Sequence, residues 1–345
     1  MSMIVAPHVA AHASGDRRAG DEVIVLSGLT KLYEPTPRWM RIFARTHIKE
    51  PVRALDGVDL VVRAGEICAI VGPNGAGKTT MFRIIIGLTT ATGGSGSVLG
   101  LDVARDSERI RKVVGWMPSE DRSLLMRATV AENLHLHGRL QGMTRREVAR
   151  RIAEVVAAVG LERRTQTVVA GLSAGMKARL RLARALLPEP RALILDEPTG
   201  AIDPIAAHGM LELITRLVER ERLAVLISSH RLEEIEALRS RALLLDGGRV
   251  KYAGDLDDLR DEWDKPRLEV VFGSAAMAEL AACDLRERGV PLSVDGAILR
   301  CEVDTGVGAI LAGLGPLAAT VQRIREIPMP LRDLIARVYQ TGGGS

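Results

Sequence analysis

The chain has 345 residues, of which 47% are hydrophobic, 26% charged and 3% aromatic. This composition is typical of a globular protein with room for more than one domain, and so few aromatic residues argue against a platform that stacks nucleic-acid bases. The net charge of +4 is too small to indicate nucleic-acid binding, and the three cysteines have no metal-like spacing and fit a reducing cytosol.

The N-terminal residues 1–20 have neither the basic start nor the sustained apolar segment of a signal peptide, so we expect a flexible tail. No apolar run elsewhere approaches the ~18–20 residues that a membrane-spanning helix needs. We therefore expect a soluble protein, and any membrane part would be another polypeptide.

Two strands, over residues 23–29 and 58–63, are predicted to form a small antiparallel sheet near the start of the folded chain. Within the segment between them, 34–52, four cations recur at helical spacing and would share one helix face. These cations are Arg38, Arg41, Arg45 and Lys49. The segment is interpreted either as a solvated basic loop or as an amphipathic element on anionic lipid or a membrane partner.

The strongest motif, over residues 72–79, matches the phosphate-loop pattern G-x-x-x-x-G-K-[ST] at every fixed position. A buried strand is predicted before it, over residues 66–71, and a helix after it, over 80–86. Glycines let a ligand approach the backbone closely, and N–H groups at a helix start form a cradle for anions. Lys78 can reach the β- and γ-phosphates of a nucleotide, and the Thr79 hydroxyl can bind Mg²⁺. The nucleotide-binding residues expected here are Gly72, Pro73, Asn74, Gly75, Ala76, Gly77, Lys78, Thr79 and Thr80.

The middle of the chain is predicted to continue with a short strand within 88–100 and another strand over residues 113–118. A helical subdomain is then expected from about residue 121 to 180. It contains two helices with apolar residues at helical spacing, over residues 129–140 and 144–159, and the second begins with a capping box.

Several short motifs follow this segment in a fixed order. Leu-Ser-Ala-Gly-Met at 172–176 precedes a helix predicted over 177–187, and an apolar strand over 192–196 ends in Asp196 and Glu197. Ser229 and His230 follow another apolar strand. The remaining predicted elements are the strand over 223–228, helices over 205–219 and 231–238, and a strand over 242–246. Strands and helices that alternate in this way favour a mainly parallel sheet with helices on its faces.

A charged boundary at residues 255–265 separates this α/β region from the C-terminal part. There, strands are predicted over residues 267–272 and 297–303, and helices over 275–287 and 331–338. We expect a small α+β accessory domain over 256–341 with no visible catalytic constellation, followed by a flexible Gly-rich end.

The motifs, taken together and in this order, resemble those of the ATP-binding-cassette (ABC) transporter ATPases over residues ~23–254. The resemblance implies an α/β P-loop NTPase domain over 21–255, with a mainly parallel core sheet, an antiparallel β subdomain and the helical subdomain. It also implies that 172–176 is the signature motif usually written LSGGQ, in which Ala174 and Met176 are departures.

The same resemblance implies roles for residues outside the phosphate loop. Glu197 would be the general base, His230 would contact the γ-phosphate, and Asp196 would hold Mg²⁺ through water. Tyr33 occupies the position of the adenine-stacking aromatic residue. Three further residues would act across a dimer that encloses two ATP molecules: Ser173, Gly175 and Asp203.

One position departs from the family pattern. The glutamine expected after residues 116–118, which meets Mg²⁺ in the family, is replaced by Ser119 and Glu120. The metal contact therefore passes either to Ser119, acting through water, or to Glu120. We favour Ser119, because the charge of Glu120 would repel the γ-phosphate unless the metal lay between them.

We therefore expect the ATP-hydrolysing subunit of an ABC transporter, more similar to exporters than to importers, with ATP and Mg²⁺ as cofactors. Its partners would be a second cassette, in a homodimer or a paired cassette, and a separate membrane permease at the inner face of the cell membrane. The expected cargo is a polysaccharide, a glycolipid or a hydrophobic drug. One alternative is a cassette ATPase that acts on ribosomes or DNA. Another is a regulatory module without turnover, against which Glu197 and His230 argue.

Overall fold

The computed structural model describes residues 21–35, 50–119, 123–263, 267–302 and 314–341. The predicted N-terminal tail, the four cations between 36 and 49, and Glu120 lie outside these ranges. The chain divides into two compact units, with the boundary between Leu256 and Asp257.

A six-stranded sheet in the order β10-β9-β3-β8-β7-β6 forms the centre of the first unit. Its strands are β3 (Ile67–Val71), β6 (Val114–Met117), β7 (Ala192–Asp196), β8 (Ala224–Ser228), β9 (Arg241–Asp246) and β10 (Arg249–Asp255). Every neighbouring pair is parallel except β9 and β10. This confirms the predicted mainly parallel core. Helices cover a sheet of this kind on both faces, so both faces of its strands are buried. The strand sequences are therefore continuous apolar runs.

Three helices follow strands of this sheet, as the alternating pattern predicts: α1 (Lys78–Ile85), α6 (Pro204–Glu221) and α7 (Leu232–Leu238). Helix α1 buries Met81 and Phe82, and the Phe82 ring meets Trp116 of β6 edge to face at 6.0 Å. Full burial of such a side chain contributes about 1.5–3 kcal/mol, so α1 holds the phosphate loop firmly against the sheet.

The predicted antiparallel sheet is present, in the order β2-β1-β4-β5. It consists of β1 (Glu22–Tyr33), β2 (Val52–Arg63), β4 (Gly93–Val98) and β5 (Leu101–Asp102). Strands β1 and β2 are longer than predicted because pairing between them continues to Tyr33 and Val52. A helix that was not predicted, α2 (Ser107–Val113), follows this sheet; it is short and buries only Ile110.

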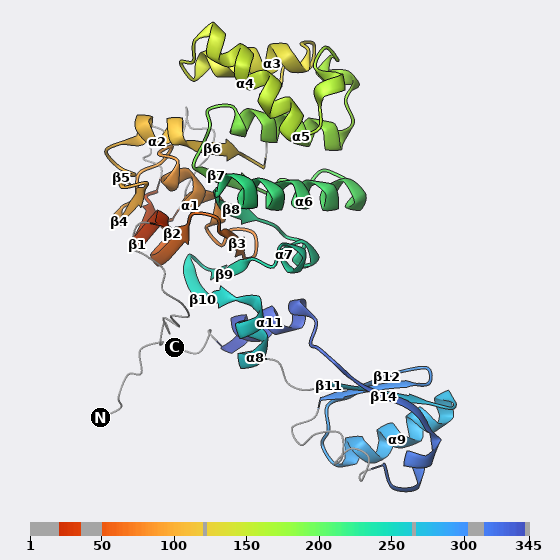
Figure 1. The fold of residues 1–345 in the computed structure, drawn as a ribbon. Helices are drawn as coiled ribbons and strands as arrows, with labels where there is room; N and C mark the ends of the chain where they lie inside the picture. Colours follow the sequence, from red (N-terminus) through yellow and green to blue (C-terminus); the bar gives the residue numbers. More distant parts are fainter. Residues whose placement is uncertain (1–20, 36–49, 120–122, 264–266, 303–313, 342–345) are drawn as a thin grey trace, which may run out of the picture. The chain divides into compact units, whose positions relative to one another are not determined.

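Helices α3 (Val130–Leu140), α4 (Arg145–Ala158) and α5 (Ala174–Leu186) form the helical part of the first unit. Figure 1 shows them gathered beyond β6. Helix α4 begins with the predicted capping box, in which Thr144 and Glu147 exchange hydrogen bonds with each other's backbone N–H groups. Two 3₁₀ turns, Glu162–Arg164 and Val169–Gly171, connect α4 to α5.

Helix α5 begins three residues earlier than predicted. The Ser173 side chain accepts a hydrogen bond from the Met176 N–H and so caps the helix ahead of Ala174. At its other end, Arg151 of α4 donates hydrogen bonds to the carbonyl oxygens of Leu186 and Leu187 at 2.8 and 3.2 Å. The start of the helix therefore falls within the signature motif rather than after it.

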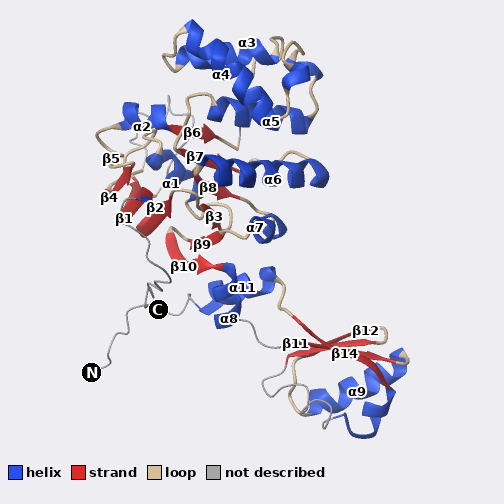
Figure 2. Ribbon diagram, in the orientation of Figure 1, coloured by secondary structure: helices blue, strands red, loops and turns tan. Residues whose placement is uncertain are grey.

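The second unit is built on a four-stranded antiparallel sheet in the order β12-β13-β11-β14. Its strands are β11 (Arg267–Phe272), β12 (Leu292–Asp295), β13 (Ile298–Glu302) and β14 (Val321–Ile327). Helix α9 (Ala275–Glu287) packs small apolar side chains against one face, and Figure 2 shows it lying along this sheet. Helix α11 (Leu331–Thr341) corresponds to the helix predicted over 331–338. Two elements were not predicted: helix α8 (Leu256–Trp263), which lies in the expected charged boundary, and a 3₁₀ turn, Gly315–Thr320. Strands β12 and β14 were not predicted either.

A charged residue lies almost buried in the sheet of the second unit. Glu269 on β11 is 5% exposed and accepts hydrogen bonds from Arg300 at 3.0 Å and Arg325 at 2.7 Å. Burial acts to raise the pKa of the Glu269 carboxyl, but the hydrogen bonds from Arg325 and Arg300 outweigh it and hold that pKa below its ordinary value.

No helix in the described ranges combines the length and the apolar character that a bilayer crossing requires.

Candidate nucleotide-binding site

The phosphate loop joins the end of β3 to the start of α1 and comes close to neighbouring backbone. A Cβ atom on Gly72 would lie 2.2 Å from the Leu245 carbonyl oxygen, and one on Gly77 would lie 2.3 Å from that of Ala54. Gly77 also has φ +107°, which side chains rarely adopt, and no side chain caps α1 from this position. The N–H groups at the start of α1 therefore face the loop, an arrangement that suits an anion.

Lys78 is the first residue of α1 and is 7% exposed. Its ammonium group donates hydrogen bonds to the carbonyl oxygens of Gly72 and Pro73 at 2.5 and 3.1 Å, so it lies over the loop. Burial lowers the pKa of Lys78, and the carboxylates of Glu197 and Asp196 partly oppose that shift. A cation in this place can neutralise phosphate charge inside the loop.

Asp196, the last residue of β7, is 2% exposed and contacts α1, β8 and the loop after β6. Its Oδ2 atom accepts hydrogen bonds from the hydroxyls of Thr79 at 3.0 Å and Ser119 at 3.4 Å. Its Oδ1 atom accepts one from the Ser228 hydroxyl at 2.7 Å. Oxygen atoms of carboxylate and hydroxyl groups are the ligands that Mg²⁺ prefers, so this donor set fits that ion.

Ser228 is a site residue that the sequence analysis missed. It is the last residue of β8 and lies opposite Asp196 in the parallel register. Besides donating to Asp196, its hydroxyl accepts a hydrogen bond from the Glu197 N–H at 3.1 Å. The sequence did offer a signal, since Ser228 is a polar residue at the end of an apolar strand. The carboxyl ends of neighbouring parallel strands lie at one edge of the sheet, so such a residue is expected near Asp196.

Glu197 and His230 meet at this edge. His230 Nε2 lies 2.6 Å from Glu197 Oε1, and both side chains are partly exposed. Glu197 has φ +51°, a left-handed conformation that is unusual for a residue with a side chain. Its N–H also donates to the Ser228 carbonyl oxygen at 3.2 Å, which holds this strained turn in place.

Tyr33 is the last residue of β1, and the Lys31 ammonium lies 4.9 Å from the centre of its ring. Tyr33 is only partly buried. The packing of Lys31 on the ring is a cation–π contact, which the sequence analysis did not anticipate.

The remaining predicted site residues lie at helix starts. Ser173 caps α5, and Asp203 caps α6 by accepting a hydrogen bond from the Ala206 N–H at 2.9 Å. A Cβ atom on Gly175 would lie 3.1 Å from Cβ of Ala206, so the signature glycine packs closely on α6. Among the described residues, no hydrogen bond or ion pair joins Ser173 or Gly175 to the phosphate loop of the same chain.

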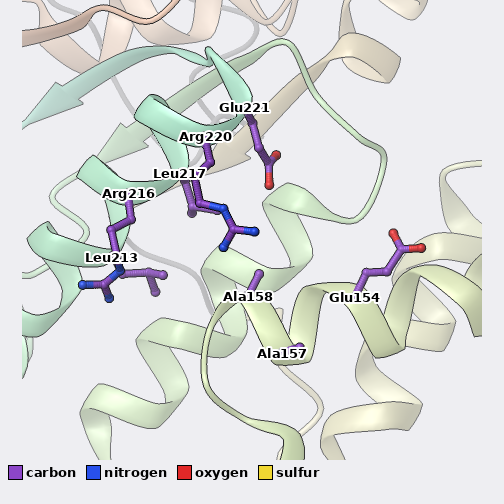
Figure 3. Close-up of a pocket in the computed structure, with 8 residues that line it drawn as sticks. All are labelled: Glu154, Ala157, Ala158, Leu213, Arg216, Leu217, Arg220 and Glu221. Carbon is purple, nitrogen blue, oxygen red and sulfur yellow. The ribbon is translucent and has the colours of Figure 1, made fainter.

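A cavity of about 330 Å³ lies apart from these loops, between α4 and α6. Figure 3 shows Glu154 on the α4 side and Arg216 and Arg220 on the α6 side. None of its lining residues is one that the sequence motifs single out, so it is not part of the candidate site.

The loops just described match a known family. The profile of the ABC transporter family matches residues 55–200, which include the phosphate loop, the signature motif and Asp196 with Glu197. The ABC transporter ATP-binding protein NatA of Bacillus subtilis (strain 168) is 34% identical over 226 residues, covering 66% of this chain and 92% of NatA. The chain belongs to the ABC transporter ATP-binding proteins. It is an ATPase with the ABC cassette fold, as the motifs predicted.

Other ABC proteins extend this comparison. Nod factor export ATP-binding protein I of Neorhizobium galegae is 38% identical over 232 residues, covering 67% of this chain and 66% of that protein. The Rhizobium meliloti protein of the same name is 40% identical over 208 residues, covering 60% and 62%. The chain thus spans slightly less than two thirds of the length of these two relatives.

Solved structures share the cassette fold. An ATP-binding subunit of an ABC transporter superposes with a TM-score of 0.56 at 30% identity, covering 70% of this chain and 92% of that one. A dimeric post-hydrolysis state of the ATP-binding cassette MJ0796, bound to ADP and Pi, superposes with a TM-score of 0.57 at 26% identity, covering 68% and 98%. The ABC cassette fold of the chain is therefore shown by both sequence and structure.

Proposed function

We propose that this chain is the ATP-hydrolysing subunit of an ABC exporter, and that it works as a dimer on a separate membrane permease. The observation that carries the catalytic part is the position of Asp196. Its carboxylate gathers Thr79, Ser119 and Ser228, and the next residue, Glu197, contacts His230. One edge of the sheet thus holds both a donor set for Mg²⁺ and a general base.

The phosphate loop binds and orients the nucleotide in this proposal. The N–H groups of residues 72–80 and the Lys78 ammonium bind the phosphates, and Tyr33 stacks on the adenine. Thr79 would hold Mg²⁺ directly, while Asp196 and Ser119 would hold it through water. The chemistry that this ion would supply is neutralisation of charge on the phosphate oxygens.

Glu197 is proposed to accept the proton of the attacking water. In this proposal His230 Nε2 carries a proton and donates a hydrogen bond to Glu197 Oε1 across the 2.6 Å contact, so Oε2 can accept one from water. The strained turn at Glu197 fixes the direction of this carboxylate. His230 then stands beside the γ-phosphate, as the family pattern implies.

Dimerisation is proposed because, within the described part of the chain, no hydrogen bond or ion pair joins Ser173 or Gly175 to the phosphate loop. At the start of α5 they present a helix N-terminus, which suits the γ-phosphate bound by a second cassette. Asp203, at the start of α6, would lie near the same contact. The dimeric post-hydrolysis structure of the cassette MJ0796 with ADP and Pi supports this arrangement.

The permease is proposed on the basis of the relatives and of an apolar surface on the helical subdomain. Leu136 and Leu140 of α3 lie four residues apart, and both are exposed; the exposed fraction of Leu140 is 76%. Leu125 and Met126, shortly before the start of that helix, are exposed as well. Exposed apolar side chains that gather on one element are typical of a protein contact. A permease of this kind would place the chain at the inner face of the cell membrane.

Export is proposed because several relatives are Nod factor export proteins. A polysaccharide, a glycolipid or a hydrophobic drug is the cargo class that we propose. We propose the predicted C-terminal domain, residues 256–341, as an accessory domain. The segment 34–52 is proposed to contact anionic lipid. A role on ribosomes or DNA is the alternative.

Two measurements test this proposal. Release of phosphate from ATP by the purified chain, with Glu197→Gln as the matched inactive control, tests the catalytic part. Co-purification with a six-helix membrane protein encoded beside this gene tests the permease part. A chain that releases phosphate no faster than the Glu197→Gln control would refute the catalytic assignment, and a stable complex with ribosomes instead of a membrane protein would favour the alternative.

A further inference from the structure

One buried carboxylate outside the nucleotide motifs joins the two loops that carry Glu197 and His230. Glu234 lies in the first turn of α7 and is 6% exposed. Its Oε2 atom accepts hydrogen bonds from the hydroxyls of Thr199 at 2.6 Å and Ser229 at 2.7 Å. Thr199 follows β7 and Ser229 follows β8, so a single oxygen atom connects two loops that are separate in the sequence.

The other oxygen of Glu234 extends the connection. Its Oε1 atom lies 3.3 Å from Nη1 of Arg231, whose Nη2 donates to the Ile202 carbonyl oxygen at 3.4 Å. The Arg231 N–H in turn donates to the Ser229 hydroxyl at 3.0 Å. Glu234 therefore contacts both residues that flank His230, Ser229 and Arg231.

The same carboxylate constrains the Glu197 side of the pair. Thr199 is two residues beyond Glu197, and the Glu197 carbonyl oxygen accepts a hydrogen bond from the Gly200 N–H at 3.2 Å. The turn 197–200 is thus closed on itself and tied to α7 through Thr199. Each partner of the 2.6 Å contact between Glu197 and His230 sits on a loop that Glu234 holds.

A buried carboxylate is costly unless several donors satisfy it, and two hydroxyls and a guanidinium supply them here. A carboxylate accepts at both oxygens, whereas an amide presents two N–H donors on one side. Glutamine at this position cannot accept all three bonds, although it has nearly the same shape. The chemistry of the network therefore requires glutamate.

We propose that Glu234 is a positioning residue for ATP hydrolysis. By binding Ser229 and Thr199, it keeps His230 and Glu197 in contact with each other. This inference rests on the proposed function of the Glu197–His230 pair. Glu234 itself touches neither residue and is not part of the phosphate cradle. Its loss misplaces the general base and leaves the nucleotide-binding loop intact.

The test uses the full chain and separates binding from turnover. Glu234→Gln and Thr199→Val should each leave the dissociation constant of a fluorescent ATP analogue within about twofold of wild type while lowering kcat by about ten- to a hundredfold. Thr199→Ser keeps the hydroxyl and should restore kcat. The matched control is Glu233→Gln, which removes the same charge from the exposed neighbouring residue and should have no effect.

A double variant decides whether the bond between the two side chains carries the effect. Glu234→Gln combined with Thr199→Val should be about as slow as the slower single variant, because both changes remove one shared contact. Wild-type kcat in Glu234→Gln, or a loss of ATP affinity that matches the loss of kcat, would overturn the inference. Absence of hydrolysis in the wild-type chain would instead overturn the proposed function.

Discussion

His230 Nε2 lies 2.6 Å from Oε1 of Glu197, although the two residues come from loops after different strands. Strands β7 and β8 are parallel neighbours, so their carboxyl ends meet at one edge of the sheet. The turn at Glu197, with φ +51°, directs its carboxylate along that edge towards His230. Because His230 contacts only one oxygen of the Glu197 carboxylate, the other oxygen can accept a hydrogen bond from water.

Replacing Glu197 by glutamine should abolish turnover without weakening ATP binding. The amide cannot accept a proton, and removal of a general base typically lowers the rate by about 10²–10⁴-fold. The phosphate loop is unaffected, so the dimer closed on ATP should accumulate. Phosphate release and size-exclusion chromatography with ATP measure the two effects. Near wild-type hydrolysis by this variant would refute the role of Glu197.

Ser119 should influence the magnesium requirement more than Glu120 does. Its hydroxyl lies 3.4 Å from Oδ2 of Asp196, on the same oxygen that accepts from Thr79. Ser119→Ala removes one oxygen donor from this set, so we expect the rate to need more free Mg²⁺. Glu120→Gln is the comparison variant. The ATPase rate against free Mg²⁺ should shift further for Ser119→Ala, and a larger shift for Glu120→Gln would reverse the assignment.

The elements that carry the site could be predicted because each combines an apolar run with a motif of fixed spacing. Strand β7 ending at Asp196 is an example. Shorter or more polar elements could not be predicted: α2 buries a single residue, and β14 has an apolar residue, only partly buried, at every third position rather than in alternation. Strand β14 forms because Arg325 pairs with Glu269 across the sheet, a contact between residues 56 positions apart.

The contacts within the site were likewise beyond local patterns. The bond from Ser228 to Asp196 and the bond from Thr199 to Glu234 form only when β7 and β8 lie side by side. The capping box of α4 could be predicted, since Thr144 and Glu147 are three residues apart and interact within one helical turn.

The three cysteines should differ widely in reactivity. Burial raises the pKa of Cys68 to about 12 and that of Cys301 to about 11, whereas Cys283 is exposed. Because the thiolate is the reactive form, a thiol reagent at pH 8 should modify Cys283 rapidly and the other two only after unfolding. Cys283→Ser should remove the rapid phase. A rapid phase that persists in this variant would show that Cys68 or Cys301 is accessible.

The stability of the C-terminal unit should fall in acid because of Glu269. Its pKa is lowered in the folded chain, so the ion pairs with Arg325 and Arg300 stabilise the unit at pH values above the ordinary glutamate pKa. That contribution is lost as the pH falls through the lowered pKa. Glu269→Gln should lower the Tm of the C-terminal unit at pH 7. In the acid range, the Tm of this variant should depend less on pH than that of the wild type. A variant whose Tm follows the wild-type curve at every pH would contradict this.

Two inactive variants should complement each other if the active sites are shared between chains. Lys78→Ala removes the cation of the phosphate loop, and Ser173→Arg blocks the start of α5 that would face the partner's nucleotide. A heterodimer of the two carries both lesions at one site and none at the other. Ser173 is also a helix cap worth about 1 kcal/mol, so circular dichroism must first show that Ser173→Arg is folded. Each variant alone should lack ATPase activity, and mixing them should restore part of it together with an ATP-dependent dimer. If two folded variants show no recovery at any mixing ratio, Ser173 does not act on the nucleotide of a second chain.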